Sequence, residues 1–470
     1  MRIQTLVLPS RFENSVIRFC ATIIGVVALS SSALAGVPAE VAERLGTDLT
    51  PMGSQKSGNK DGTIPEWTGG LQTPPANVTY KIGDRHPDPY ADDKILFTIT
   101  AANAGQYEKN LTETTRAMFA NYPDTYKINI FPGRRSCAQP AAVYAMIKQN
   151  ALTSDETPDG AGLTGAIRGT AFPIPSTAQK IMWNHKLKFR NFKVTRQFVA
   201  AVPTRGGEFS PYVVQDEVLQ SYSDPTKTDV SELGNISLRY IANTIAPARA
   251  AGNVVMVHET INQSEGSRKA WVYSPGTRRV RRAPDIAYDN PGTNSDGLQT
   301  VDSFGGFNGA TDRYDWTYIG RQEAYVPANN YRMEQSDLQY KDIFTAGGHI
   351  NQDLPRYELQ RTEVIEANLR ASVRHLYPKR KFWIETDAWD VINTSQYDAR
   401  GQLWRVQEMF ASTYYEVPVC AGVGGVSYDL NAGRYLVGGF TNQEPPINFF
   451  ADELKEDRYT PDSIRRLGVR

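Results

Sequence analysis

The chain lacks most of the short motifs that carry catalysis. It contains no G-x-S-x-G, no phosphate-binding Walker loop, no H-E-x-x-H and no C-x-x-C, and its five histidines stand singly. These absences exclude the common serine hydrolases, nucleotide hydrolases and zinc proteases, and they leave no metal-ligand spacing. We therefore expect neither a metal nor another cofactor, and a protein that is not an enzyme.

The chain also lacks an excess of charge. Lysine and arginine together number 51, and aspartate and glutamate also number 51. This balance gives no electrostatic reason to expect a nucleic-acid partner or a strongly anionic membrane surface.

Long apolar runs are missing after the first 35 residues. Residues 1–35 combine a basic start, an apolar run over residues 19–29 and the small-residue sequence Ala33-Leu34-Ala35. That run is shorter than the roughly 20 residues that span a bilayer, so the pattern is typical of a cleavable signal peptide. We predict cleavage after Ala35 and a soluble periplasmic protein.

Cysteine is scarce, because only Cys137 and Cys420 follow the predicted leader. In an oxidising compartment an even pair favours a disulfide. A bridge here would tie the N-terminal region to the last strands.

What the chain does contain is a strand pattern. Residues 236–283 read as four consecutive strands with apolar and polar residues alternating, and similar stretches lie at residues 192–221 and 357–441. About a dozen strands exceed what one flat sheet usually carries. The predicted fold is mainly β with helices (α+β), a large curved antiparallel sheet or half barrel covered by helices.

Four segments divide the chain in this interpretation. Residues 1–35 are the signal peptide, 36–190 a Gly/Pro-rich and helical region packed on the sheet, 191–445 the β domain and 446–470 a C-terminal tail. A helix over residues 176–190 would lie across the open sheet.

Some details of the strand pattern are also predicted. Residues 274–277 (Ser-Pro-Gly-Thr) indicate a type II turn with glycine at positive φ, and residues 422–425 (Gly-Val-Gly-Gly) read as a hairpin turn. Residues 283–330 break the strand rhythm and are expected to form a long irregular segment.

Candidate ligand-binding residues come from the aromatic and basic side chains of these elements. Trp183 on the predicted helix, with Trp271 and Tyr273 of the meander, could line a cavity or simply pack a core. Arg278 and Arg282 share one strand face, where two guanidiniums could bind a phosphate or carboxylate head group or pair with nearby aspartates.

A hydrolase is one of the functional alternatives that the sequence leaves open. Glu385 and Asp387 lie close in sequence, and an enzyme of this class would need them to face each other across a cleft.

Three blocks of sequence resemble a known family. They are LTPMGSQKSGNKDGTIPEWTGG, FGGFNGATDRYDW and RHLYPKRKFWIETDAWDVINTSQYDARGQLWRV. They look like the Gram-negative periplasmic DUF1329 family, whose members are described as outer-membrane lipoprotein-sorting-like proteins. The resemblance covers essentially all of the chain after the leader. Cys137 and Cys420 are not part of the family pattern.

The resemblance implies a fold similar to the lipoprotein carriers LolA and LolB and a role with hydrophobic cargo. It implies a non-enzymatic carrier for a lipid-like or acylated molecule in outer-membrane transport. The alternative is an interaction module that bridges an RND-type exporter and an outer-membrane protein without a small ligand. The family supplies no ligand residues that could be transferred to this chain.

Overall fold

The computed structural model describes residues 36–283 and 288–468. The predicted signal peptide and its cleavage site lie outside these residues. Within the described ranges, no helix is long and apolar enough to cross a membrane.

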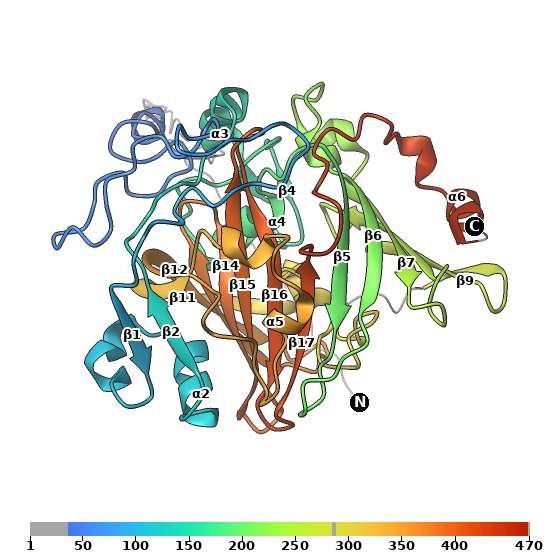
Figure 1. Cartoon of the computed structure of the whole chain (residues 1–470). Helices are drawn as coiled ribbons and strands as arrows, with labels where there is room; N and C mark the ends of the chain where they lie inside the picture. Colours follow the sequence, from blue (N-terminus) through green and yellow to red (C-terminus); the bar gives the residue numbers. More distant parts are fainter. Residues whose placement is uncertain (1–35, 284–287, 469–470) are drawn as a thin grey trace, which may run out of the picture. The chain divides into compact units, whose positions relative to one another are not determined.

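One large sheet of fifteen strands dominates the described residues (Figure 1). Its strands are β1 (Phe97–Thr100), β2 (Lys127–Ile130), β5 (Lys193–Ala201), β6 (Tyr212–Leu219), β7 (Ile236–Ala246), β8 (Val254–Thr260), β9 (Lys269–Ser274), β10 (Arg279–Arg282), β11 (Tyr314–Pro327), β12 (Tyr357–Leu369), β13 (Lys379–Glu385), β14 (Asp390–Tyr397), β15 (Leu403–Tyr414), β16 (Val419–Asp429) and β17 (Arg434–Phe440). The order is β1-β2-β12-β13-β14-β15-β16-β17-β5-β6-β7-β8-β9-β10, with β11 paired to β12. A two-stranded sheet joins β3 (Asp155–Glu156) and β4 (Leu163–Thr164).

The prediction of a mainly β protein with a large open, curved sheet is confirmed. The strand path starts at β1 and ends at β10, and no pairing joins these two strands within the described residues. The sheet is not purely antiparallel as predicted, because β2 meets β12 in parallel at Ile130 and Tyr357. That link brings β1 and β2, from the N-terminal region, into the sheet.

A single long-range pairing unites the two halves of the sheet. β17 runs antiparallel to β5, with Val437 opposite Ala201 and Gly438 opposite Ala200. Figure 1 shows the late strands β14–β17 beside the earlier strands β5–β7. Two meanders, β5–β10 and β12–β17, thereby become one sheet.

The N-terminal region covers one face of β15–β17 and β5. It supplies α2 (Glu113–Asn121) and α3 (Ala141–Thr153), and α5 (Tyr340–Ile343) adds to the cover later in the chain. Helix α1 (Ala39–Ala42) packs on α3. Thr112 caps α2 by accepting a hydrogen bond from the Thr115 N–H. The resulting core is the largest in the described residues and includes Met118, Ile128 and Phe440.

The disulfide between Cys137 and Cys420 joins this cover to β16, with the two Cα atoms 5.6 Å apart. It closes a loop of 283 residues in sequence.

Helix α4 (Ala178–Leu187) lies over the other face of the sheet. It begins at Thr177, whose side chain accepts from the Lys180 N–H. Ile181 and Met182 pack with residues of β12–β14 such as Phe382, and this contact anchors the helix on the sheet.

The C-terminal segment ends in α6 (Pro461–Gly468), which packs beside β8 and β9. Ile464 and Tyr459 share a small apolar cluster with Met256 and Tyr273. The tail therefore covers the face of β8 and β9 that carries these two residues.

Three details of the predicted pattern are wrong. Residues 314–327 form strand β11 inside the segment expected to be irregular. Among the described strands this branch strand pairs with β12 alone, so it exposes residues such as Tyr318 and lacks the apolar alternation that would have marked it as a strand. Residues 422–425 lie inside β16 and are not a turn. The β9–β10 connection is not a type II turn, because its positive φ falls on Arg278 at 54° and Gly276 does not share it.

Candidate functional site

A cavity of about 530 Å³ lies against the sheet. Its walls are one face of strands β5–β8 and β15–β17, helix α4 and the segment over residues 293–308. This volume falls within the range of about 300–1,000 Å³ that small-molecule sites usually occupy.

Strand alternation builds the apolar wall. Every second residue of β5–β8 points into the cavity, and the apolar members of this set are Val194, Phe198, Ala200, Val214, Val218, Leu238, Tyr240, Ala242, Val255 and Val257. Most of them stay half-buried, whereas Val199 and Ala201 on the opposite face of β5 are fully buried. The cavity face of these strands is therefore not filled by the protein's own side chains.

Small residues form the floor of the cavity on β16 and β17. We call Gly422, Gly424, Gly425, Gly438 and Gly439 the glycine floor, since all five line the cavity. Gly425 and Gly438 are paired across the two strands. A Cβ placed on Gly438 would meet no atom within 4 Å, so the space above it is empty.

Charged groups interrupt the apolar lining at a few points. Arg196 pairs with Asp216 at 2.9 Å, Arg268 pairs with Glu259 at 2.5 Å, and Lys188 pairs with Asp390. Burial raises the pKa of the Asp216 carboxyl although Arg196 opposes the shift. Desolvation costs are high for such pairs, so each charge in the wall needs its partner.

The end of α4 places three more polar side chains at the cavity. Burial, with Lys188 and Arg190 nearby, holds the pKa of His185 well below its usual value, and the Val391 N–H donates to its Nδ1. Burial lowers the pKa of Lys186 to about 8 and that of Arg190 to about 10. At neutral pH the histidine is thus neutral while the lysine and arginine carry charge.

The structure separates the five predicted ligand residues. Trp183 lines the cavity and has an exposed fraction of 0%. Trp271 and Tyr273 pair with Met256 and Val254, which are on the opposite face of β8 from Val255 and Val257, so both aromatics lie away from the cavity. The alternation of strand residues placed Trp271 and Tyr273 on one common face, but it could not show which face of the sheet borders the cavity.

Arg278 and Arg282 are not brought to the cavity either. Both side chains are exposed on the β9–β10 hairpin, and Arg282 lies over the Trp271 ring with its guanidinium 5.8 Å from the ring centre. The cavity cations that sequence reasoning missed are Lys186, Lys188, Arg190, Arg196 and Arg268. The glycine floor was also missed, although the glycine-rich stretches of residues 422–425 and 438–439 were a usable signal.

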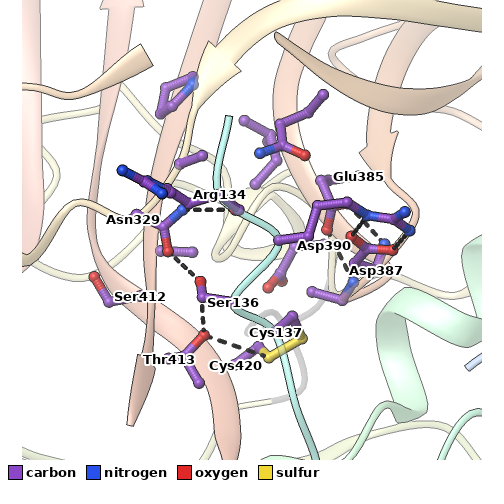
Figure 2. Close-up of a pocket in the computed structure, with 17 residues that line it drawn as sticks. Arg134, Ser136, Cys137, Asn329, Glu385, Asp387, Asp390, Ser412, Thr413 and Cys420 are labelled. Atoms are coloured by element: carbon purple, nitrogen blue, oxygen red, sulfur yellow. Dashed lines mark hydrogen bonds and ion pairs between the residues drawn. A yellow bond between two sulfur atoms is a disulfide. The ribbon is translucent and has the colours of Figure 1, made fainter. Parts of the chain in front are cut away.

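A second, smaller pocket of about 50 Å³ lies beside the disulfide (Figure 2). Ser136 Oγ donates to Asn329, and Thr413 Oγ1 lies 3.3 Å from Ser136 Oγ. Asp390 lines both this pocket and the larger cavity. This volume is enough for a few water molecules and lies well below the range that small-molecule sites usually occupy.

The two acids of the hydrolase alternative are both in this pocket (Figure 2). Arg135 donates to both Asp387 oxygens at 2.7 and 2.8 Å, and Ser54 adds a third bond. Glu385 accepts from the N–H groups of Asp387 and Ala388, and burial raises its pKa to about 8. These contacts hold the turn after β13 and do not place the two acids across a cleft from each other.

No group of three or more His, Cys, Asp or Glu side chains is arranged to hold a metal ion in the described ranges. The larger cavity is lined by apolar side chains, several polar side chains and a few charged ones.

Comparison with known proteins identifies the family of this chain. The family model described as "Protein of unknown function (DUF1329)" matches residues 98–465. An uncharacterized protein of Pseudomonas aeruginosa, PA3922, is 43% identical over 454 residues, which cover 95% of this chain and 98% of that protein.

Two solved structures align with parts of this chain at low identity. A putative outer membrane lipoprotein-sorting protein domain from Vibrio parahaemolyticus is 12% identical and aligns with 58% of this chain and 92% of its own, with a TM-score of 0.41. The LolA superfamily protein NE2245 from Nitrosomonas europaea is 13% identical over 61% of this chain and 99% of its own, with a TM-score of 0.36. From the family match and the Pseudomonas relative, the chain belongs to the DUF1329 family.

Proposed function

We propose that this protein is a non-enzymatic carrier that holds a hydrophobic, lipid-like molecule in the cavity between α4 and the sheet. The observation that carries the proposal is the unfilled apolar face of β5–β8 above the glycine floor. A strand face that only had to pack a core would carry a large side chain at Gly438, where a Cβ would meet no atom within 4 Å.

Burial supplies the binding free energy in this proposal. Each methylene group taken from water contributes about 0.8 kcal/mol, so a long acyl chain would bind tightly without a single hydrogen bond. The same free energy opposes release, which suits a carrier that hands its cargo to a partner. RND-type exporters and outer-membrane proteins are the partners that we propose.

We also propose a periplasmic location. The leader pattern of residues 1–35 supports it, and so does the disulfide between Cys137 and Cys420, because disulfides persist in oxidising compartments.

The cavity can be tested by filling it. Gly438→Leu adds a side chain into empty space without a positive-φ conflict, and leucine favours a strand more than glycine does. The variant should fold normally and lose the cargo. Gly105→Leu is the matched control, since Gly105 also has empty space around it but is exposed and outside the cavity.

The measurement is organic-solvent extraction of each purified protein followed by mass spectrometry of the extract. We expect an apolar molecule in close to equal molar amount from the wild type and from Gly105→Leu, and about tenfold less from Gly438→Leu, a loss of about 1.4 kcal/mol in binding. Extracts without any apolar molecule, together with no binding of added long-chain lipids, would refute the carrier. An interaction module without a small ligand would then be the better explanation.

A further inference from the structure

The charges that line the cavity do not balance. Its cationic side chains are Lys186, Lys188, Arg190, Arg196 and Arg268, and its carboxylates are Asp216, Glu259 and Asp390. Three ion pairs use all three carboxylates. Two positive charges, on Lys186 and Arg190, remain without a carboxylate of their own.

The positive charge of Lys186 is partly compensated by neighbouring groups. Its Nζ donates to the Gly309 carbonyl oxygen at 2.5 Å and lies over the Trp183 ring, 4.8 Å from the ring centre. Glu259 is near enough to raise its pKa, although the same carboxylate is paired with Arg268.

Arg190 has no carboxylate partner anywhere in the described ranges. Its two Nη atoms donate only to backbone carbonyls, to Lys186 O at 3.3 Å and His185 O at 3.0 Å. These carbonyls end α4, where the helix dipole favours a cation. A guanidinium carries five N–H donors, so these two bonds leave donors free.

An unpaired guanidinium in an apolar cavity is costly unless a ligand supplies the anion. Carboxylate and phosphate groups match the guanidinium fork and bind it through paired hydrogen bonds. The apolar wall of β5–β8 begins near this point, since Val194 and Phe198 follow Arg190 closely in sequence and both line the cavity.

We propose that the cargo is an anionic amphiphile, whose carboxylate or phosphate head binds Arg190 while its apolar tail lies along β5–β8 and the glycine floor. This inference rests on the proposed function. It moves the head-group role from Arg278 and Arg282, which are exposed on the β9–β10 hairpin, to a cation inside the cavity.

The test compares ligands that share one tail. Delipidated protein is titrated with palmitate, hexadecyl phosphate and hexadecanol, and with inorganic phosphate alone, by isothermal calorimetry. We expect the two anionic ligands to bind about tenfold or more tightly than hexadecanol, and inorganic phosphate to show no measurable binding. The ratio of palmitate to hexadecyl phosphate affinity decides between a carboxylate and a phosphate head.

Variants assign the effect to Arg190. Arg190→Gln should weaken the binding of the preferred anion about tenfold and leave hexadecanol unchanged, whereas Arg190→Lys should recover part of the loss. Arg282→Gln, which removes an exposed guanidinium outside the cavity, should bind all ligands like the wild type. Circular dichroism and thermal melting check that each variant is folded.

The outcomes separate the two proposals. Two results would overturn the anionic head group and leave the carrier proposal standing. One is an equal affinity for palmitate and hexadecanol, and the other is a loss of affinity in Arg190→Gln that is the same for both ligands. Failure of every long-chain ligand to bind would overturn the carrier itself.

Discussion

The two faces of strands β15–β17 and β5 make opposite use of the same backbone. One face is sealed by helices α2, α3 and α5, with Val406, Val426 and Val437 fully buried beneath them. The other face carries glycines and half-buried apolar side chains around a cavity of about 530 Å³. The first face contributes a tightly packed core, whereas the second borders an unfilled volume and gives up part of the packing that a core would supply.

The largest contrast should appear when one aromatic ring is removed from each face. Phe440→Ala on the sealed face should lower the free energy of unfolding by about 3–5 kcal/mol, because the ring is fully buried among Phe344 and Phe410. Phe198→Ala on the cavity face should cost less than about 1 kcal/mol, since its ring is half-buried beside space that is already empty. Urea denaturation of both variants checks the contrast, and similar losses would mean that the two faces are packed alike.

The second-largest loss of stability is expected when the disulfide is removed. Replacing both Cys137 and Cys420 by serine should destabilise the protein by about 2–4 kcal/mol, because the bridge closes a long loop and pins the N-terminal cover to β16. The check is thermal melting with and without a reducing agent. The wild type should melt at a lower temperature when reduced, while the double variant should not respond. An unchanged wild-type transition under reduction would contradict a stabilising role.

A smaller effect concerns an acid on the sealed face. Glu408 is buried and accepts hydrogen bonds from Tyr126 and Tyr357, and burial raises its pKa from 4.5 to about 7. The folded protein therefore binds this proton more tightly than the unfolded chain does. Its contribution to stability is complete below pH 4.5 and is lost as the pH rises to about 7.

Glu408→Gln should remove this pH dependence. Between pH 4.5 and pH 8 the variant should gain about 3 kcal/mol relative to the wild type. Urea denaturation across this pH range measures the difference, and Glu265→Gln on the surface is the matched control. A difference that stays constant with pH would show that folding does not shift the pKa of Glu408.

Local patterns in the sequence predicted many elements well. The four consecutive strands expected over residues 236–283 are β7–β10, and the helix expected over residues 176–190 contains α4. Strand β11 was missed because a branch strand with one neighbour carries less apolar alternation than a central strand. The glycines of residues 422–425 were assigned to a turn because glycine most often marks one.

The site was harder to predict because it joins distant segments. Arg190 and Gly438 line one cavity although 248 positions, 438 minus 190, separate them in the chain. Trp183 lines the cavity and is also part of a packed core, whereas Trp271 and Tyr273 share a strand face that is covered by α6. No local pattern contains this information.

The sequence by itself determined which residues share a strand face and where the capped helices begin, because strand period and capping depend on neighbours in the chain. Only the tertiary structure decided which face is sealed and which is hollow. That choice depends on the pairing of β17 with β5 and on where α4 and the N-terminal cover pack. These contacts depend on long-range packing that no local window of the sequence contains.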